Sequence, residues 1–215
     1  MAVVEHPLEE MARAWLADDP DPATRATLEG WLTTGDEAAL REAFRERLQF
    51  GTAGIRGPLG PGPNRMNRRL VRKVAAGLAV HLGGQGTVVI GRDGRRGSVE
   101  FADDAAAVLA GAGIRALLLP GPVPTPVLAF AVAHLGCDAG VMVTASHNPR
   151  DDNGMKVYGP DGAQIVPPTD VAISTAIDAV GDVLGLPMGQ PEHLGDEVLH
   201  AYLDAATARV PAGPR

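Results

Sequence analysis

The sequence predicts an α/β fold, with a layered mixed β-sheet between helices, preceded by a helical extension at the N-terminus. Short apolar runs alternate with segments of helical periodicity from residue 67 onward, which is typical of parallel strands joined by helices. The dipeptide Asn153-Gly154 indicates a type I′ turn, which would add an antiparallel strand. Residues 8–48 place apolar side chains at helical spacing before any strand pattern begins.

Residues 1–47 are expected to form the extension, as helical-hairpin material. Asp21 and Pro22 mark the start of its second helix, because aspartate favours the N-cap and proline the first turn. The acidic cluster Asp18-Asp19-Pro20-Asp21 could bind a cation. We interpret it instead as the boundary between two helices.

Residues 48–208 are expected to form the α/β domain, and residues 209–215 a linker. Glycines and prolines exclude a helix from residues 49–63 and let the backbone there approach a ligand closely. Ser98 and Thr125-Pro126 are expected to cap helices. The predicted strands are 87–90, 114–119, 140–144, 154–158 and 163–166, and the predicted helices are 67–82, 98–112, 125–135, 168–180 and 195–208.

Composition restricts the location and the partners of the chain. Its 215 residues carry a net charge of −7, which argues against a nucleic-acid or membrane-surface partner. Cys137 is the single cysteine, so no intrachain disulfide is possible and a reducing compartment is favoured. The sequence contains neither a secretory signal pattern nor a run of the roughly 18 apolar residues that a membrane span needs. We therefore predict a cytoplasmic protein.

The reactive side chains are concentrated after the apolar run 140–143. Thr144-Ala145-Ser146-His147-Asn148-Pro149 combines a hydroxyl, an imidazole and an amide, and Lys156 follows closely. These groups are the components of group transfer at a serine. Only Lys73 and Lys156 are lysines among 19 basic residues. A lysine retained in this segment suggests a need for an amine that can release a proton.

A serine hydrolase is disfavoured. Its nucleophile turn needs glycine two positions on either side of the serine, where this chain has Thr144 and Asn148. His147 is adjacent to Ser146, and neighbouring side chains on an extended backbone point apart. A serine with only a structural role in the loop stays open on the motif alone.

Arginines and glycines accompany this segment. Arg92, Arg95 and Arg96 follow a strand end and could bind phosphate or form an ion-paired turn with Asp93. The loop 51–57, with Arg56, matches neither the phosphate-loop nor the dinucleotide-binding motif. Their coincidence with Ser146 in one α/β unit favours an anionic substrate and phosphoryl chemistry.

Residues 144–149 also resemble the phosphoserine signature of the α-D-phosphohexomutase superfamily. Four further motifs are similar to the same family in the same order, so the resemblance covers about residues 48–160. They are Phe50-Gly51-Thr52-Ala53-Gly54-Ile55-Arg56-Gly57, Gly91-Arg92-Asp93, Pro124-Thr125-Pro126 and Asp152-Asn153-Gly154-Met155-Lys156. The extension, with Trp15-Leu16 and Asp19-Pro20, resembles the subgroup of phosphoglucomutase/phosphopentomutase-type and bacterial phosphomannomutase-type enzymes.

The resemblance implies that Ser146 carries a phosphate and exchanges it with a sugar phosphate through a sugar bisphosphate that reorients. It implies Mg²⁺ on the phosphate of Ser146, phosphate contact by Arg56, and a sugar 1,6-bisphosphate as activator. His147 and Lys156 would transfer protons to and from the sugar hydroxyl. The residues implied to support the loop or the substrate are Thr144, Asn148 and Arg92.

The resemblance extends only to the first of four family domains. The Asp-rich metal loop of domain II, the sugar loop of domain III and the phosphate loop of domain IV have no counterpart here. We therefore expect a domain-I fragment, incomplete for turnover, whose partners are a small-molecule sugar phosphate and the missing domains II–IV. The alternatives are a non-catalytic sugar-phosphate-binding or interaction domain and, with less support, a serine esterase. The sequence does not select among glucose, mannose, glucosamine and pentose phosphates.

Overall fold

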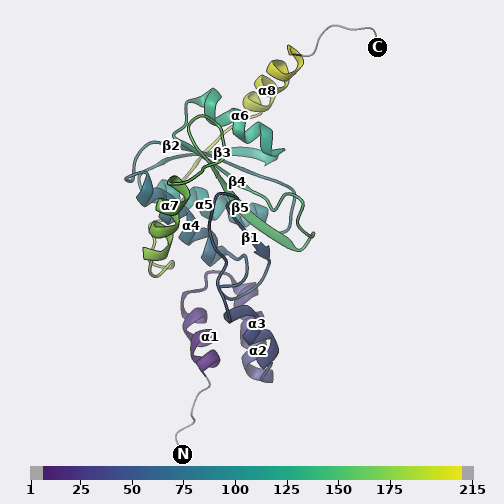
Figure 1. The fold of residues 1–215 in the computed structure, drawn as a ribbon, viewed down its shortest axis with the longest axis vertical. Coiled ribbons are helices and arrows are strands. Elements are labelled where there is room, and N and C mark those ends of the chain that lie inside the picture. Colours follow the sequence, from purple (N-terminus) through teal and green to yellow (C-terminus); the bar gives the residue numbers. More distant parts are fainter. Residues whose placement is uncertain (1–6, 210–215) are drawn as a thin grey trace, which may run out of the picture.

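The computed structural model describes residues 7–209, and Figure 1 shows an elongated molecule with helices on both sides of a sheet. The N-terminal helices lie at one end of the long axis and the last helix lies at the other. The helices are α1 (Pro7–Asp18), α2 (Pro22–Thr34), α3 (Glu37–Phe44), α4 (Arg68–His81), α5 (Ser98–Gly111), α6 (Thr125–Leu135), α7 (Thr169–Ala179) and α8 (Glu197–Thr207). The strands are β1 (Ile55–Pro58), β2 (Thr87–Arg92), β3 (Arg115–Pro122), β4 (Ala139–Val143), β5 (Asp152–Tyr158) and β6 (Glu192–His193).

The six strands form one mixed sheet in the order β1-β5-β4-β2-β3-β6. Strands β4, β2, β3 and β6 run parallel to one another, whereas β5 is antiparallel to both β4 and β1. The predicted fold class, a mixed sheet layered between helices, is confirmed.

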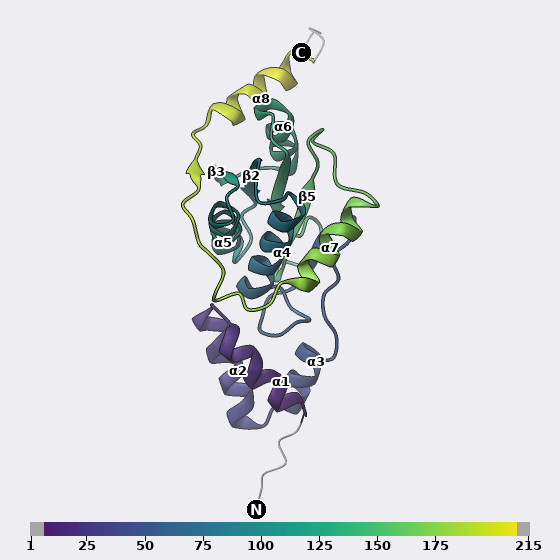
Figure 2. The same ribbon diagram turned by 90° about the vertical axis from the view of Figure 1, so that its left-hand side faces the viewer.

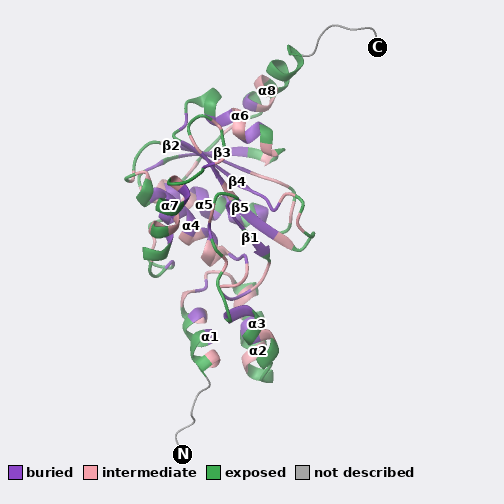
Figure 3. Cartoon of the chain, viewed as in Figure 1, coloured by how far each residue is buried: buried purple, intermediate pink, exposed green. Residues whose placement is uncertain are grey.

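Alternation along the strands divides the core between the two faces of the sheet. On β2, Val88 and Ile90 pack with α4, α5 and α7, whereas Val89 packs with α6 and α8. Figure 2 shows α4, α5 and α7 grouped together, with α6 and α8 higher up, and Figure 3 shows that the buried residues follow the sheet. Helices therefore cover both faces of the sheet. Because β4, β2 and β3 are parallel, their carboxyl ends lie along the same edge of the sheet.

The extension contains three helices, not the two of the predicted hairpin. The Asp21 side chain accepts a hydrogen bond from the Ala23 amide, which confirms the predicted cap of α2. Gly35, with φ of 66°, then ends α2, and Asp36 caps the additional helix α3 by accepting a hydrogen bond from the Ala39 amide. A separate apolar cluster holds α1–α3 together.

Asp19 supports the interpretation of the acidic cluster as a helix boundary. Its buried carboxylate accepts hydrogen bonds from Trp15 Nε1, the Asp21 amide and Thr24 Oγ1. Its acceptor positions are thus engaged within the extension.

The hairpin-turn prediction at Asn153-Gly154 is wrong. Both residues lie inside β5, and the chain reverses within residues 144–151 instead. Asn153 is buried and its amide is hydrogen-bonded to the 96–98 segment, so tertiary contacts override the local turn preference. The predicted strand 163–166 is also absent, since only an isolated bridge joins Gln164 to Tyr158.

Two cap predictions are wrong as well. Gly97 and Pro124 occupy the N-cap positions of α5 and α6, and neither cap uses a side-chain hydrogen bond. Ser98 is the first residue of α5, and its hydroxyl donates a hydrogen bond to Asp93. The predicted linker lies outside the described residues except for Arg209. No helix among residues 7–209 is long and apolar enough to cross a membrane.

Candidate functional site

Ser146 lies in the loop that joins β4 to β5, beyond the carboxyl end of the parallel strand β4. Its φ is 54°, and it is the one non-glycine residue with a positive φ among residues 7–209. The Ser146 amide donates a hydrogen bond of 3.0 Å to Thr144 Oγ1. Left-handed backbone at a non-glycine residue is uncommon and concentrates at functional sites.

The ends of the loop are joined by hydrogen bonds. Asn148 Nδ2 donates to Asp152 Oδ2 over 2.8 Å, and the Asn148 amide donates to the Ala145 carbonyl. Thr144 and Asn148 therefore shape the loop through their own contacts. His147 is exposed, and within residues 7–209 no hydrogen bond joins it to Ser146. The expectation of an extended backbone at Ser146 is wrong.

Arg56 and Lys156 lie on the same face of the sheet. Arg56 pairs with Gly154 across β1 and β5, and Lys156 lies two residues further along β5. Alternate residues of a strand share a face, and such diagonal neighbours have Cα atoms about 7–8 Å apart. The sequence predicted both residues for one site, and the register brings them to one face.

Glycines permit the close approach of β1 to the loop. A Cβ on Gly154 would lie 2.8 Å from the Arg56 Cβ and 3.0 Å from the Thr144 carbonyl oxygen. Gly54, with φ of 77°, turns the chain into β1, and a Cβ there would collide with the Met155 carbonyl oxygen. Arg56 is thereby held beside the Ser146 loop.

Within residues 7–209, no hydrogen bond or ion pair engages the side chains of Arg56, His147 or Lys156. Arg56 and His147 are exposed, and Lys156 is half-buried. Three basic or titratable groups are thus available to a ligand near a serine hydroxyl. The positive charges of Arg56 and Lys156 favour an anion as that ligand.

Arg95 is a site residue whose contacts the sequence did not predict. Its Nη1 donates to the carbonyls of Pro149 (2.6 Å) and Asp152 (3.0 Å), and its Nη2 to those of Ser146 (3.0 Å) and Asn148 (2.9 Å). Its Nε faces Asp93 Oδ2 at 3.4 Å. No sequence pattern identifies backbone carbonyls as the partners of an arginine. The sequence therefore left two interpretations open for Arg95, phosphate binding and an ion-paired turn.

A polar network fixes the turn that carries Arg95. Asp93 Oδ1 accepts hydrogen bonds from the Arg95 amide and from Ser98 Oγ. Asn153 Nδ2 donates to Ser98 Oγ and to the Arg96 carbonyl. Ser98 and Asn153 are both fully buried, so this network rigidly connects the end of β2 to the start of β5.

The other two arginines of the turn differ from Arg95. Arg92 ends β2 beside Val143, and its Nη1 lies 3.4 Å from the Asp93 carbonyl oxygen. Arg96 is 69% exposed and lies 3.4 Å from Asp151. Arg92 therefore remains near the loop, and Arg96 faces solvent.

The comparisons with known proteins agree with this geometry. The family model for phosphoglucomutase/phosphomannomutase, alpha/beta/alpha domain I, matches residues 47–183. This chain belongs to the phosphoglucomutase/phosphomannomutase family. The matched region contains the Ser146 loop together with Arg56, Arg92, Arg95 and Lys156.

Individual relatives are similar over the same region. A Haemophilus influenzae protein named "Probable phosphomannomutase" is 49% identical over 158 residues, which cover 68% of this chain and 33% of the relative. A Staphylococcus aureus phosphoglucomutase is 48% identical over 147 residues, which cover 67% of this chain and 27% of the relative. The chain thus spans about a third or less of the length of these relatives.

Solved structures of the family share the fold. The crystal structure of a Thermus thermophilus protein named "putative phosphomannomutase" has a TM-score of 0.69 and 34% identity, covering 77% of this chain and 37% of that one. A Burkholderia thailandensis phosphoglucomutase/phosphomannomutase family protein has a TM-score of 0.59 and 27% identity, covering 75% of this chain and 35% of that one.

The described residues do not fit a resident Mg²⁺. No group of three or more histidine, cysteine, aspartate or glutamate side chains that could hold a metal occurs between residues 7 and 209. Oxygen ligands, carboxylates above all, are what Mg²⁺ requires. In this part of the family fold, a metal would depend on the oxygens of a phosphate for its anchor.

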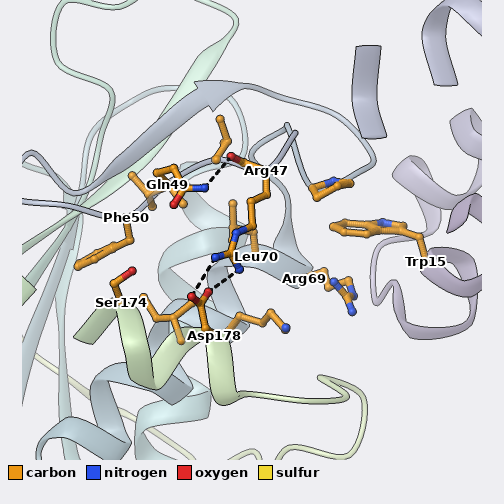
Figure 4. Close-up of a pocket in the computed structure, with 13 residues that line it drawn as sticks. Trp15, Arg47, Gln49, Phe50, Arg69, Leu70, Ser174 and Asp178 are labelled. Carbon is orange, nitrogen blue, oxygen red and sulfur yellow. Dashed lines mark hydrogen bonds and ion pairs between the residues drawn. The ribbon is translucent and has the colours of Figure 1, made fainter. Parts of the chain in front are cut away.

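A hollow lies between the extension and the family domain, and Figure 4 shows its lining. Arg47 and Asp178 form a bidentate ion pair across it, at 2.6 and 2.9 Å. Lys73 also lines it, and burial, together with the charge of Arg69, lowers the pKa of Lys73. The hollow lies on the face of β1 that carries Ile55, opposite Arg56, so it is separate from the Ser146 site.

Proposed function

We propose that this chain forms the phosphoryl-accepting wall of a phosphohexomutase, with Ser146 as the phosphate carrier. The observation that supports this most is the left-handed Ser146 on a fixed loop, beside cationic groups without partners in the described chain. Family membership supplies the reaction class, an isomerisation by phosphate transfer. The substrate class is a sugar phosphate of hexose or pentose type.

The proposed first half-reaction moves one phosphoryl group from a sugar 1,6-bisphosphate, the activator, to Ser146. A bond forms between phosphorus and Ser146 Oγ while the bond between phosphorus and the sugar oxygen breaks. The hydroxyl proton of Ser146 leaves, and the departing sugar oxygen gains a proton. The second half-reaction reverses these steps on the other oxygen of a sugar monophosphate.

Charge neutralisation is the main requirement of this chemistry, because phosphoserine and substrate are both anions. Arg56 is suited to contact the transferring phosphate, since a guanidinium binds phosphate oxygens bidentately. Arg92 lies near enough to the loop to support the same phosphate. In this proposal, His147 and Lys156 take and return the two protons.

The proposal places the remaining parts of the site outside this chain. Mg²⁺ would bind the phosphate carried by Ser146 and take its remaining ligands from other domains. The two half-reactions above are described only for the residues of this chain. We also propose a cytoplasmic location, with Cys137 kept as a free thiol. Residues 1–47 would be an extension of domain I, residues 48–208 the domain itself and 209–215 the link to domain II.

A two-step transfer assay tests this function. The chain is incubated with labelled glucose 1,6-bisphosphate and MgCl₂, desalted, and then given unlabelled glucose 1-phosphate. We expect label to enter the protein and then to leave as sugar bisphosphate. Ser146→Ala should take up no label. Ser174→Ala, which alters a serine that lines the hollow between the extension and the family domain, should behave as the unmodified chain.

A non-catalytic sugar-phosphate-binding or interaction domain is the second candidate. The observation that favours it is the pair of cations on one face of the sheet, Arg56 and Lys156, which can bind a phosphate without any transfer. That function predicts saturable binding of glucose 1,6-bisphosphate with no label on the protein. The transfer assay separates the two functions directly.

A further inference from the structure

We infer that Arg95 is a positioning residue, which holds the loop from Ser146 to Asp152 in the shape that phosphate transfer at Ser146 requires. Its guanidinium acts on the loop backbone and does not bind the phosphate. This inference rests on the proposed function of Ser146. Measuring loop order and phosphate uptake in the same variants separates the failure of one from the failure of the other.

The first argument is the set of acceptors that the Arg95 guanidinium faces within the chain. A guanidinium has five N–H groups, and each one here faces an acceptor. Four acceptors are carbonyl oxygens of the loop, at 2.6 to 3.0 Å, and the fifth is the Asp93 carboxylate. Both terminal nitrogens of Arg95 are thus engaged by loop carbonyls, and its Nε faces the Asp93 carboxylate at 3.4 Å, so the guanidinium is directed to the chain and away from a substrate phosphate.

The second argument is the position of those carbonyls. Nη2 binds the carbonyls of Ser146 and Asn148, and Nη1 binds those of Pro149 and Asp152. These residues flank the loop from its nucleophile to its return into β5. One rigid, planar group therefore binds both sides of the loop in which the chain reverses. A lysine ammonium cannot replace it, because its three donors extend from a single nitrogen atom.

The third argument is the rigidity of the support. The Arg95 side chain is only 16% exposed. Hydrogen bonds that involve Asp93, Ser98 and Asn153 stabilise the turn that carries it. Residues 144–151 contain no helix or strand, and Ser146 is in a conformation that non-glycine residues rarely adopt. Arg95 is the contact that connects this hydrogen-bonded turn to the loop of Ser146.

Arg96 is the matched control. It is the next residue, carries the same side chain and is 69% exposed, with only an exposed pair to Asp151 at 3.4 Å. Arg96→Ala removes the same net charge from the same turn without touching the loop carbonyls. Such an exposed pair is worth about 0–1 kcal/mol, so little should change.

The experiment compares Arg95→Ala, Arg95→Lys and Arg96→Ala in two measurements. The first is the rate of phosphate uptake from glucose 1,6-bisphosphate as a function of its concentration. The second is amide hydrogen exchange over residues 144–152. A melting curve for each variant establishes that it is folded, and Arg95→Lys covers the case in which Arg95→Ala does not fold.

We expect Arg95→Ala to lower the maximal uptake rate about 100-fold, the cost of a misplaced reacting group, with little change in the half-saturating concentration. Exchange in the loop should accelerate, and added guanidinium ion should partly restore uptake. Arg95→Lys should fall between the two alanine variants. Arg96→Ala should match the unmodified chain in both measurements.

Two results would overturn the inference. One is unchanged hydrogen exchange in the loop of a folded Arg95→Ala or Arg95→Lys variant. The other is a defect confined to the half-saturating concentration, which would make Arg95 a phosphate ligand. If the unmodified chain takes up no phosphate, the proposed function fails, while the exchange measurement still decides whether Arg95 orders the loop.

Discussion

Lys156 and Arg56 occupy one face of the sheet beside the Ser146 loop, yet their chemical capacities differ. A guanidinium stays protonated and can only neutralise charge, whereas an amine can also release a proton. This difference suggests why Lys156 is a lysine in a chain whose basic residues are, apart from Lys73, otherwise arginines. It also allows the two roles of Lys156, cation and proton carrier, to be separated by one substitution.

Lys156→Arg keeps the positive charge and removes the proton carrier. We expect the maximal rate of phosphate uptake from glucose 1,6-bisphosphate to fall about 100-fold or more, which is typical for loss of a general acid or base. Binding of the bisphosphate should change little, and Lys156→Met should weaken that binding as well. Uptake by Lys156→Arg at the unmodified rate would show that Lys156 supplies charge alone.

Cys137 gives a pH-dependent prediction in a part of the chain that the site does not use. The thiol is 2% exposed, and burial raises its pKa to about 11. In the unfolded chain it ionises near 9.0, so the free energy of unfolding should decrease as the pH rises from about 9 to 11.

Alkylation measures this shift. At pH 8 the folded chain should react slowly with iodoacetamide at Cys137, because the thiolate is the nucleophile. The same chain in guanidinium chloride should react rapidly, and mass spectrometry counts the label. Equal rates in both conditions would mean that the thiol is neither buried nor shifted.

The site residues differ in how far the sequence reveals them. Ser146, His147 and Lys156 carry reactive groups in one short segment, so residue types alone single them out. The role of Arg95 depends on backbone carbonyls, which have no signature in the sequence. The left-handed conformation of Ser146 is likewise set by the fold around it, and local preference would assign it to glycine.

At the scale of elements, the helices and central strands follow from periodicity, while the edges of the sheet do not. The apolar runs of β2, β3 and β4 and the periodic segments of α4, α5 and α6 predict those elements within a few residues. Strand β1 has four residues that include glycine and proline, and β6 has two. Strands this short are established by pairing with β5 and β3, which a local pattern cannot show.

Packing of α4 against α7 requires a glycine inside a helix. A Cβ on Gly77 would lie 2.5 Å from Ile177 Cγ1 and 2.7 Å from the Ile177 amide nitrogen. We expect Gly77→Ala to lower the free energy of unfolding by about 1–3 kcal/mol, the usual effect of overpacking, despite the better helix propensity of alanine. Urea unfolding of the two chains measures this difference.

Gly30 provides the control for that prediction. It lies in α2, where an added Cβ would have nothing within 4 Å. Gly30→Ala should therefore stabilise the chain by about 0.5–1 kcal/mol through helix propensity alone. Stabilisation by both substitutions would show that α4 and α7 are less closely packed than the Gly77 distances indicate.

At the scale of the whole molecule, one aspartate joins the extension to the family domain. Asp18, at the end of α1, pairs with Arg69 of α4 at 2.7 Å and accepts hydrogen bonds from the amides of Val183 and Leu184. The Arg69 guanidinium also lies 4.3 Å from the ring centroid of Trp15. Segments far apart in the sequence thus converge on α1.

Asp18→Ala tests this connection. We expect it to cost about 2 kcal/mol, because it removes charged hydrogen bonds that are mostly shielded from solvent. Limited proteolysis should then cut between the extension and the domain more readily. Glu9→Ala, which disrupts an exposed pair on the same helix, should have little effect on either measurement. Equal effects of both substitutions would contradict a specific role for Asp18.

The family match and the fold assign the chain to the phosphoglucomutase/phosphomannomutase family, and the matched region is domain I. The chain covers about a third or less of the length of the relatives it matches. We propose that the chain contributes a serine, Ser146, that is held ready to accept a phosphate.

Phosphopeptide mapping after incubation with glucose 1,6-bisphosphate tests that claim most directly. Mass spectrometry of the intact chain gives the number of phosphates, and fragmentation of its peptides gives their position. The account predicts one phosphate, on Ser146, and none on the Ser146→Ala variant. A phosphate on another residue, or none on the unmodified chain, would contradict it.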